Sequence, residues 1–162
     1  MGDSDSAGAN STNSVEQRST RSLDARSTAT LQDDRRCFAC GPENPEGMQL
    51  RFEYGDGEAK AVFIPQQRFA GWITILHGGI VATLLDEAMA HAAIAAGIRA
   101  VTGRLEIRFR KAAPMAATLI AAGRLESRRG RVLNLSATVT GDDGTLYAEG
   151  QGRFVADDAG GR

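Results

Sequence analysis

The stretch from Ile80 to Ile98 constrains the fold of this chain more than any other feature. It is apolar throughout except at a few positions, which are Thr83, Asp86, Glu87, His91 and Gly97. The run is too long for a strand, so we predict a buried helix. A membrane span of this length is the alternative, but two adjacent acids and a histidine near its middle would be costly in hydrocarbon. We therefore expect that this helix does not span a membrane and that a membrane is not a partner of the chain.

Short segments in which apolar and polar residues alternate lie on both sides of this helix. Met48 to Tyr54 and Glu58 to Ile64 flank Gly55-Asp56-Gly57 and predict a hairpin. Four more strands are expected after the helix, around residues 105–109, 119–125, 133–139 and 146–155. Turn residues separate them at Ala113-Pro114, Arg129-Gly130 and Gly141-Asp142-Asp143-Gly144. The pattern predicts that each strand forms a hairpin with the next in an antiparallel sheet.

Two strands, a long apolar helix and four further strands predict an α+β fold in which the sheet buries itself by wrapping around the helix. This is the hotdog architecture. We assign it to residues 35–156, and 162 residues suit one such domain. Residues 1–34 contain hardly a large apolar side chain, so we expect a disordered tail, and we expect a flexible end over 157–162.

Charge and cysteine content narrow the function classes. The formal net charge of −1 gives no electrostatic case for a nucleic-acid partner. Cys37 and Cys40 are the only cysteines, which excludes a disulfide framework. Together with the distant His77 and His91 they make a poor zinc set, so we expect no metal and no other cofactor. The chain starts without a secretory signal, and we expect a reducing cytoplasm.

Asp86 lies on an unusual face of the predicted helix. At 100° per residue the large apolar side chains form one broad side, whereas Asp86 falls opposite, among Ala82, Ala90 and Ala93. Small side chains allow a substrate or another backbone to approach, which favours a functional carboxylate; the alternative is an aspartate at a solvated helix edge. Glu87 has His91 one turn further on, and we interpret these two as a structural helix pair.

The helix is entered through His77-Gly78-Gly79, where the first N–H groups lack partners within the helix. Such an end can stabilise the oxyanion that forms when a carbonyl is attacked. Gly78 and Asp86 are about 12 Å apart along a helix axis, so one carbonyl cannot reach both. We therefore predict an isologous dimer with two sites at its interface, with pairing into tetramers left open.

The residues and their spacing favour hydrolysis of an activated acyl group. An ionised aspartate can act as general base or as nucleophile. A thiol has a reference pKa of about 8.5 and leaves readily, so a thioester needs little general-acid help.

Two segments together resemble the PaaI-like hotdog thioesterases. They are Cys37-Phe38-Ala39-Cys40-Gly41-Pro42-Glu43-Asn44-Pro45-Glu46-Gly47 and Leu76-His77-Gly78-Gly79-Ile80-Val81-Ala82-Thr83-Leu84-Leu85-Asp86-Glu87. The resemblance covers roughly Arg36 to Val155. It implies acyl-CoA as substrate, Asp86 as general base or nucleophile and Gly78 as the oxyanion donor. It further implies that His77 positions the carbonyl, beside Gly79, and that the Thr102 hydroxyl holds the attacking water or the substrate.

One position departs from the family's pattern. Some members carry Asn or Gln six residues before the histidine, where this chain has Gly71. Phe69, Trp72 and Ile73 are candidates for lining the acyl pocket, or they pack beside the helix. For the CoA phosphates the candidates are the arginines around one hairpin, which otherwise form a solvated turn: Arg124, Arg128, Arg129 and Arg131.

We thus expect a thioesterase for small or medium acyl-CoA or aryl-CoA. The alternatives are a non-catalytic acyl-CoA binder and a dehydratase that uses His77 or His91 as acid-base partner. A redox role of Cys37 and Cys40 is a further hypothesis. Acyl length, and the choice between CoA and carrier protein, are not determined by these residues.

Overall fold

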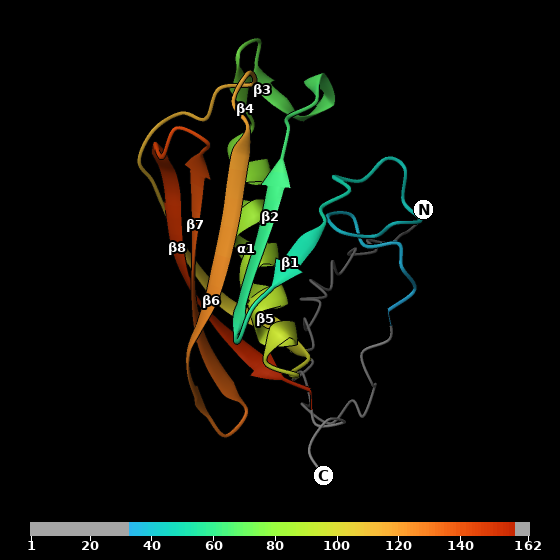
Figure 1. The fold of residues 1–162 in the computed structure, drawn as a ribbon, viewed down its shortest axis with the longest axis vertical. Helices are drawn as coiled ribbons and strands as arrows, with labels where there is room; N and C mark the ends of the chain where they lie inside the picture. The colour runs from blue at the N-terminus through green and yellow to red at the C-terminus, as the bar shows by residue number, and fades with distance from the viewer. Residues whose placement is uncertain (1–32, 158–162) are drawn as a thin grey trace, which may run out of the picture.

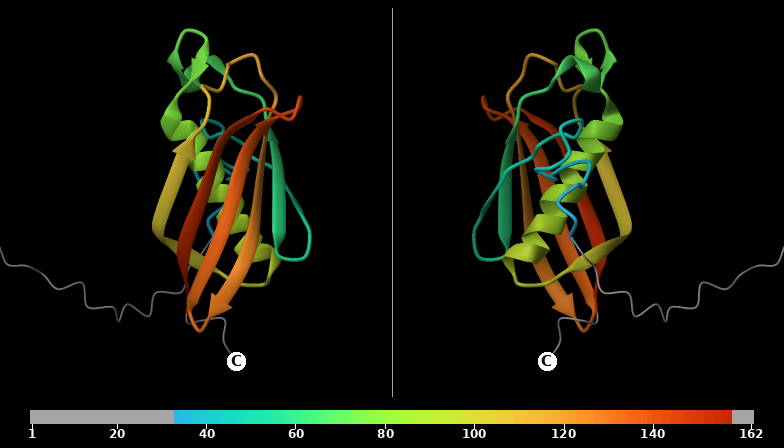
Figure 2. Two further views of the ribbon diagram at one scale, coloured as in Figure 1. Left: turned by 90° about the vertical axis from the view of Figure 1, so that its left-hand side faces the viewer. Right: turned by 90° about the vertical axis from the view of Figure 1, so that its right-hand side faces the viewer.

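The computed structural model describes residues 33–157, which form a curved antiparallel sheet around a central helix (Figures 1 and 2). The helix α1 spans Gly78–Ala95. Across the sheet the strand order is β1 (Phe52–Tyr54), β2 (Glu58–Phe63), β6 (Leu119–Arg129), β7 (Val132–Gly141), β8 (Leu146–Ala156) and β5 (Ala100–Phe109). The predicted hotdog architecture is confirmed.

The apolar run forms the predicted helix because its large side chains fill the concave face of the sheet. Leu84, Leu85 and Met89 are fully buried there. α1 is long and apolar enough to cross a membrane by length and composition, but core helices of globular domains pass the same test. At Gly123 of β6 a Cβ atom would lie 2.1 Å from the Ala88 carbonyl oxygen, so strand and helix approach too closely there for any side chain.

The hairpin predictions hold for three connections and fail for one. β1–β2, β6–β7 and β7–β8 are antiparallel hairpins at the predicted turns. β5, however, pairs with β8 and not with β6, so the segment through Ala113-Pro114 is a crossover. The reason is that β6 already has β2 on one side and β7 on the other, which leaves β5 the free edge beside β8.

Two stretches differ from the expected elements. The first strand covers only Phe52–Tyr54, because the backbone N–H groups of Met48 and Leu50 donate to the carbonyls of Phe38 and Ala39 in the preceding loop. Between β2 and α1 the chain forms a short 3₁₀ helix, η1 (Gln67–Phe69), and a small hairpin of β3 (Ala70–Trp72) and β4 (Ile75–Leu76). This hairpin extends beyond the N-terminal end of α1 (Figure 1).

The loop before β1 covers the face of α1 that the sheet leaves open (Figure 2, right). Its Ala39, Met48 and Leu50 are buried in the same core as the helix. The loop is therefore packed as part of the same core. The predicted tail and C-terminal end lie outside the described residues, apart from Asp33, Asp34 and Asp157.

Candidate active site

Asp86 and Thr102 meet at the centre of the candidate site. Thr102, near the start of β5, donates a hydrogen bond of 2.8 Å from Oγ1 to Oδ1 of Asp86 on α1. Both residues were predicted to act together only through the family resemblance. Their contact follows from β5 taking the edge position, where it runs alongside α1.

The carboxyl of Asp86 sits in an environment that favours its neutral form. Burial raises its pKa above the ordinary value, the hydrogen bond from Thr102 lowers it in part, and the neighbouring Glu87 charge raises it. A general base is most effective when its pKa lies near the working pH. A pKa raised toward neutral pH therefore suits this role. Ala82 and Ala90 beside it are half-buried as expected. Ala93, expected on the same face, is instead buried, so the open face narrows toward the C-terminal end of α1.

The N-terminal end of α1 is organised by His77. This residue is the N-cap, and its Nδ1 accepts a hydrogen bond of 2.9 Å from the Gly79 N–H. The Gly79 N–H is therefore occupied by the cap. The Gly78 N–H belongs to the first helical residue and takes part in none of the helix's own hydrogen bonds. Of the two glycines, Gly78 is the one placed to offer an oxyanion donor.

An open groove of about 610 Å³ lies at this helix end. Trp72, His77, Gly78, Phe109 and Lys111 are among the residues that line it. The Phe109 ring lies 3.9 Å from where a Cβ of Gly78 would be, so it forms a wall directly beside the glycine. Sequence reasoning missed Phe109 and Lys111, because an aromatic at a strand end and a lysine in a connection carry no distinctive pattern.

The predicted pocket residues Phe69 and Trp72 lie in different environments. Trp72 lines the groove and its side chain is largely exposed, whereas Phe69 is buried and packs against Phe63, with ring centroids 5.8 Å apart. A Cβ at Gly71 would lie 3.0 Å from Cα of His77. The position where some family members carry an amide thus borders the capping histidine, and any side chain there would be in tight contact with the His77 backbone.

The β6–β7 hairpin lies at the opposite end of the molecule from β3 and β4 (Figure 1). Of the predicted arginines, Arg128, Arg129 and Arg131 lie at its turn, and Arg124 lies further along β6. The Arg128 Nε donates to the Gly130 carbonyl at 2.9 Å, and Arg131 donates to the Ala156 carbonyl. Within one chain they do not border the groove at the helix start. Their role in binding CoA stays a prediction.

Gly78 and Asp86 are likewise kept apart, because they sit eight positions apart on the same straight helix. One chain therefore holds two separate candidate half-sites: the helix start with Phe109, and the carboxylate with Thr102.

The predicted helix pair of Glu87 and His91 is confirmed, with Oε2 and Nε2 3.6 Å apart. The other ring nitrogen of His91 makes a 2.8 Å hydrogen bond with the Tyr54 hydroxyl, and the ring stacks on Phe52 with centroids 3.9 Å apart. His91 is thus part of the packing between α1 and β1. Burial would raise the pKa of Glu87, but hydrogen bonds from His91 and Cys40 and the His91 charge hold it below its ordinary value.

Glu87 also faces both cysteines of the preceding loop. The Cys37 thiol donates to Oε1 of Glu87 at 3.7 Å. Burial, and then the Glu87 charge, raise the pKa of the Cys40 thiol well above its ordinary value. Within residues 33–157 this is the group of side chains suited to holding a metal ion.

Known proteins are similar to this chain in sequence and in fold. The family model described as "Thioesterase superfamily" matches residues 74–148. The acyl-coenzyme A thioesterase THEM4 of Mus musculus is 30% identical over 112 residues, which are 67% of this chain and 48% of that protein. The chain thus spans about half the length of this curated relative.

Several solved structures are similar to this fold. A thioesterase superfamily protein, RHA08564, aligns with a TM-score of 0.71 and 27% identity over 75% of this chain and 63% of its own. The Escherichia coli PaaI protein aligns at 0.63 and 18% identity, over 67% and 80% of the two chains. A hypothetical thioesterase of Streptococcus pneumoniae with coenzyme A aligns at 0.63 and 18%, over 66% and 84%.

The likenesses below 25% identity establish the fold. The family match extends over α1, β5, β6 and β7 and ends within the first residues of β8. The match therefore includes both Asp86 and Thr102. The chain has the hotdog fold, and over residues 74–148 it is similar to the thioesterase superfamily.

Proposed function

We propose that the protein is an acyl-CoA thioesterase in which Asp86 acts on the thioester. The observation that carries this proposal is the Asp86–Thr102 pair, a carboxyl with a raised pKa held by a hydroxyl beside small residues. A carboxylate in such a setting suits a general base or nucleophile. The groove at the helix start supplies the second requirement, a backbone N–H beside an apolar wall.

The two half-sites are joined in this proposal by a dimer formed through the β5 edge. Within the described sheet β5 has a neighbour on one side, β8, and its Val101 and Phe109 are about half exposed. A free edge strand pairs readily with a second copy. Antiparallel pairing centred between Leu105 and Glu106 sets the Thr102 end of one β5 opposite the Phe109 end of the other. Asp86 of one subunit then faces the Gly78 helix start of the other, as an isologous interface requires.

The chemistry in this arrangement is water attack. Asp86 accepts a proton from a water molecule that Thr102 helps to hold, and the oxygen forms a bond to the thioester carbon. The carbonyl electron pair moves to the oxygen, where the Gly78 N–H of the other subunit stabilises it. Collapse of this intermediate breaks the C–S bond, and the CoA thiolate leaves and takes the proton from Asp86. Direct attack by Asp86, followed by hydrolysis of the anhydride, uses the same groups.

The relatives support the substrate class. THEM4 is named an acyl-coenzyme A thioesterase, and the Streptococcus pneumoniae neighbour was crystallised with coenzyme A. Two crystallised variants of that neighbour replace by alanine a threonine and an aspartate that are 16 positions apart (68 − 52 = 16). Asp86 and Thr102 have the same separation (102 − 86 = 16).

CoA release from a panel of acyl-CoA and aryl-CoA esters, followed with a thiol reagent, tests the proposal. Replacing Asp86 by Asn should lower kcat by about 10²- to 10⁴-fold, because it removes the base without changing the shape of the side chain. Asp142→Asn, in the exposed β7–β8 turn, serves as the matched control and should keep the wild-type rate. Equal rates for wild type and Asp86→Asn would reject the role of Asp86.

A non-catalytic acyl-CoA binder is the second candidate function, favoured by the glycine at position 71. It predicts CoA-ester binding by calorimetry with no CoA release from any ester of the panel. Release that depends on Asp86 excludes it.

A further inference from the structure

The two cysteines and Glu87 converge although they are far apart in the sequence. The loop that carries Cys37 and Cys40 crosses over α1, which carries Glu87 (Figure 2, right). The two sulfur atoms and one carboxylate oxygen of Glu87 all lie within 4.8 Å of one another. All three residues are half-buried. Three atoms that bind metals as anions therefore surround one point.

The turn from Cys37 to Gly41 is shaped to bring the two sulfur atoms together. The Ala39 N–H donates to Cys37 Sγ at 3.4 Å, and the Gly41 N–H donates to the Cys37 carbonyl at 2.9 Å. A Cβ at Gly41 would lie 2.4 Å from the Cys37 nitrogen, so the turn closes only with glycine there. The backbone of the turn thus fixes the position of the Cys37 sulfur.

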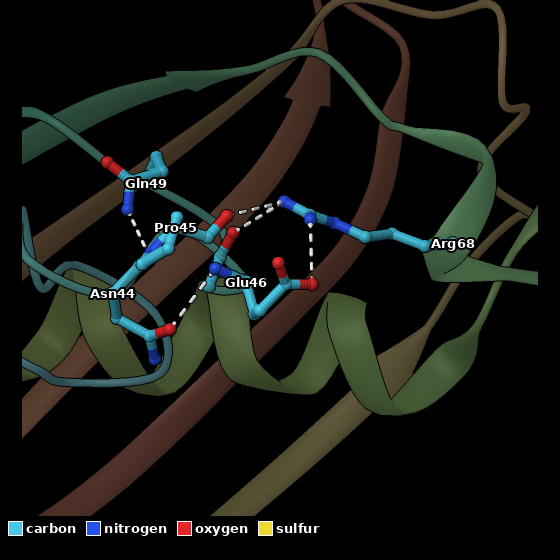
Figure 3. Close-up of polar contacts among 6 residues, drawn as sticks. Asn44, Pro45, Glu46, Gln49 and Arg68 are labelled. Carbon is cyan, nitrogen blue, oxygen red and sulfur yellow. Dashed lines mark hydrogen bonds and ion pairs between the residues drawn. The ribbon is translucent and has the colours of Figure 1, made fainter.

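The loop holds its shape through contacts that do not involve sulfur. Figure 3 shows the Arg68 side chain reaching from η1 to the carbonyls of Pro45 and Gly47, at 3.4 and 2.9 Å, and to the Glu46 carboxylate. On the other side of the loop, Gln49 Nε2 donates to the carbonyls of Gly41 and Asn44. The cysteine turn is thus positioned over α1 before anything binds to it.

The Glu87 carboxylate is oriented by a second side chain, His91, as metal-binding carboxylates commonly are. Its second oxygen faces Nε2 of His91 at 3.6 Å, and Tyr54 and Phe52 fix the His91 ring. Partners of this kind orient the ligand toward the metal and are a regular part of metal sites. Glu87 therefore has one oxygen for His91 and one for the cysteine pair.

We propose that Cys37, Cys40 and Glu87 form a binding site for Zn²⁺. Two thiolates and a carboxylate, with two residues between the cysteines, are a donor set that zinc takes in tetrahedral coordination, with a water molecule in the fourth position. Mg²⁺ and Ca²⁺ prefer oxygen ligands alone and do not fit two sulfur donors. Binding releases two thiol protons to solvent, and the ion's charge offsets two of the three negative charges.

Such an ion would tie the loop before β1 to α1 at the residue next to Asp86. It would stabilise the closed position of the loop on the helix face that the sheet leaves open. The site is separate from thioester hydrolysis, so its existence does not depend on the proposed activity.

The competing fate of this cysteine pair is a disulfide. A cation held between the two sulfur atoms and the Glu87 oxygen would pair with all three groups at once. The metal-bound form and the disulfide use the same two sulfur atoms and therefore exclude each other.

Metal analysis of the intact protein tests the proposal. Protein purified without an affinity metal and dialysed against Zn²⁺ should retain about one zinc per chain. The metal-free protein titrated with Co²⁺ should develop the sulfur-to-cobalt charge-transfer band, which only thiolate ligands produce. Cys37→Ser should abolish the band, and Glu87→Gln should weaken Co²⁺ binding about 10- to 100-fold.

Glu58→Gln, at an exposed carboxylate on β2, is the matched control and should bind Co²⁺ like wild type. Competition of wild-type protein with a coloured chelator gives the zinc affinity without any variant, should the variants fold poorly. The proposal is overturned if the folded, reduced wild type takes up no zinc in this competition. Retention of the charge-transfer band by Cys37→Ser overturns it as well.

Discussion

The Thr102 hydroxyl donates a 2.8 Å hydrogen bond to Asp86 and so joins the edge strand β5 to the middle of α1. This bond lowers the pKa of Asp86 against the effect of burial, which raises it. The strand that carries Thr102 is also one of the two edge strands of the described sheet. The ionisation of the candidate base and the proposed dimer surface therefore depend on the same element.

Removing the Thr102 hydroxyl should move the pH profile. Asp86 acts as a base only when ionised, so kcat/KM falls as the pH drops through its pKa. Thr102→Val removes the hydrogen bond that lowers this pKa, and the acid limb should shift to higher pH. The maximal rate should fall by roughly tenfold, as expected for a lost hydrogen bond to a charged group. Thr102→Ser keeps the hydroxyl and should keep the wild-type limb. An unmoved limb in the valine variant would show that this bond does not control ionisation.

Mixed dimers should recover activity that neither parent variant has. Gly78→Pro removes the proposed oxyanion N–H at the first helical position, where proline is tolerated, and should lower kcat about 10²- to 10³-fold. In a dimer of one Gly78→Pro chain and one Asp86→Ala chain, one of the two shared sites is intact. Co-expression in equal amounts should therefore restore about a quarter of the wild-type activity. No recovery, with mixed dimers present by mass spectrometry, would place both groups of each site in a single chain.

Asp86→Asn should stabilise the protein at neutral pH. Because the pKa of Asp86 is raised in the folded state, its ionised form opposes folding at pH 7, and this cost is absent when the group is neutral. The variant's thermal midpoint should exceed that of wild type at pH 7. The difference should shrink toward pH values of about 4, where the wild-type carboxyl also becomes neutral. Asp142→Asn, at an exposed turn, should show no such pH-dependent gain.

Lys111 should contribute to binding of the CoA ester. It lines the groove beside Gly78, where its charge can attract phosphates. Lys111→Ala should raise KM several-fold with kcat nearly unchanged, and the effect should diminish at high salt. Lys60→Ala removes the other lysine of the chain, on β2 outside this groove, and should leave KM unaltered. Equal KM changes in both variants would indicate a general effect of net charge.

Gly123→Ala should destabilise the fold. The new methyl group would lie 2.1 Å from the Ala88 carbonyl oxygen, so backbone on β6 or α1 must move. We expect a loss of about 1–3 kcal/mol or more in the free energy of unfolding, measured by denaturant titration. Gly55→Ala, whose Cβ would have its nearest contact at an ordinary 3.6 Å, should change the stability little. A stable Gly123→Ala variant would mean that the contact between α1 and β6 is looser than described.

The helix, its carboxylate, its glycine start and three hairpins were predictable from the sequence. Each depends on neighbours within a few positions: the apolar run, the step from His77 to Asp86, and the turn residues between β6, β7 and β8. Helical and strand periodicity and turn chemistry are local properties, which is why they can be interpreted in one sequence.

Tertiary structure alone decided where β5 lies and which side chains Glu87 meets. Strand order depends on which strand edges are already paired. Both edges of β6 are paired, with β2 and β7, so β5 cannot pair with it. Cys37 and Glu87 are in contact although 50 positions separate them in the sequence. In the sequence only the histidines stand out as further ligands beside the cysteines, so this carboxylate was missed. Contacts over such separations arise when the chain closes on its core, and they leave no periodic signature in the residues that make them.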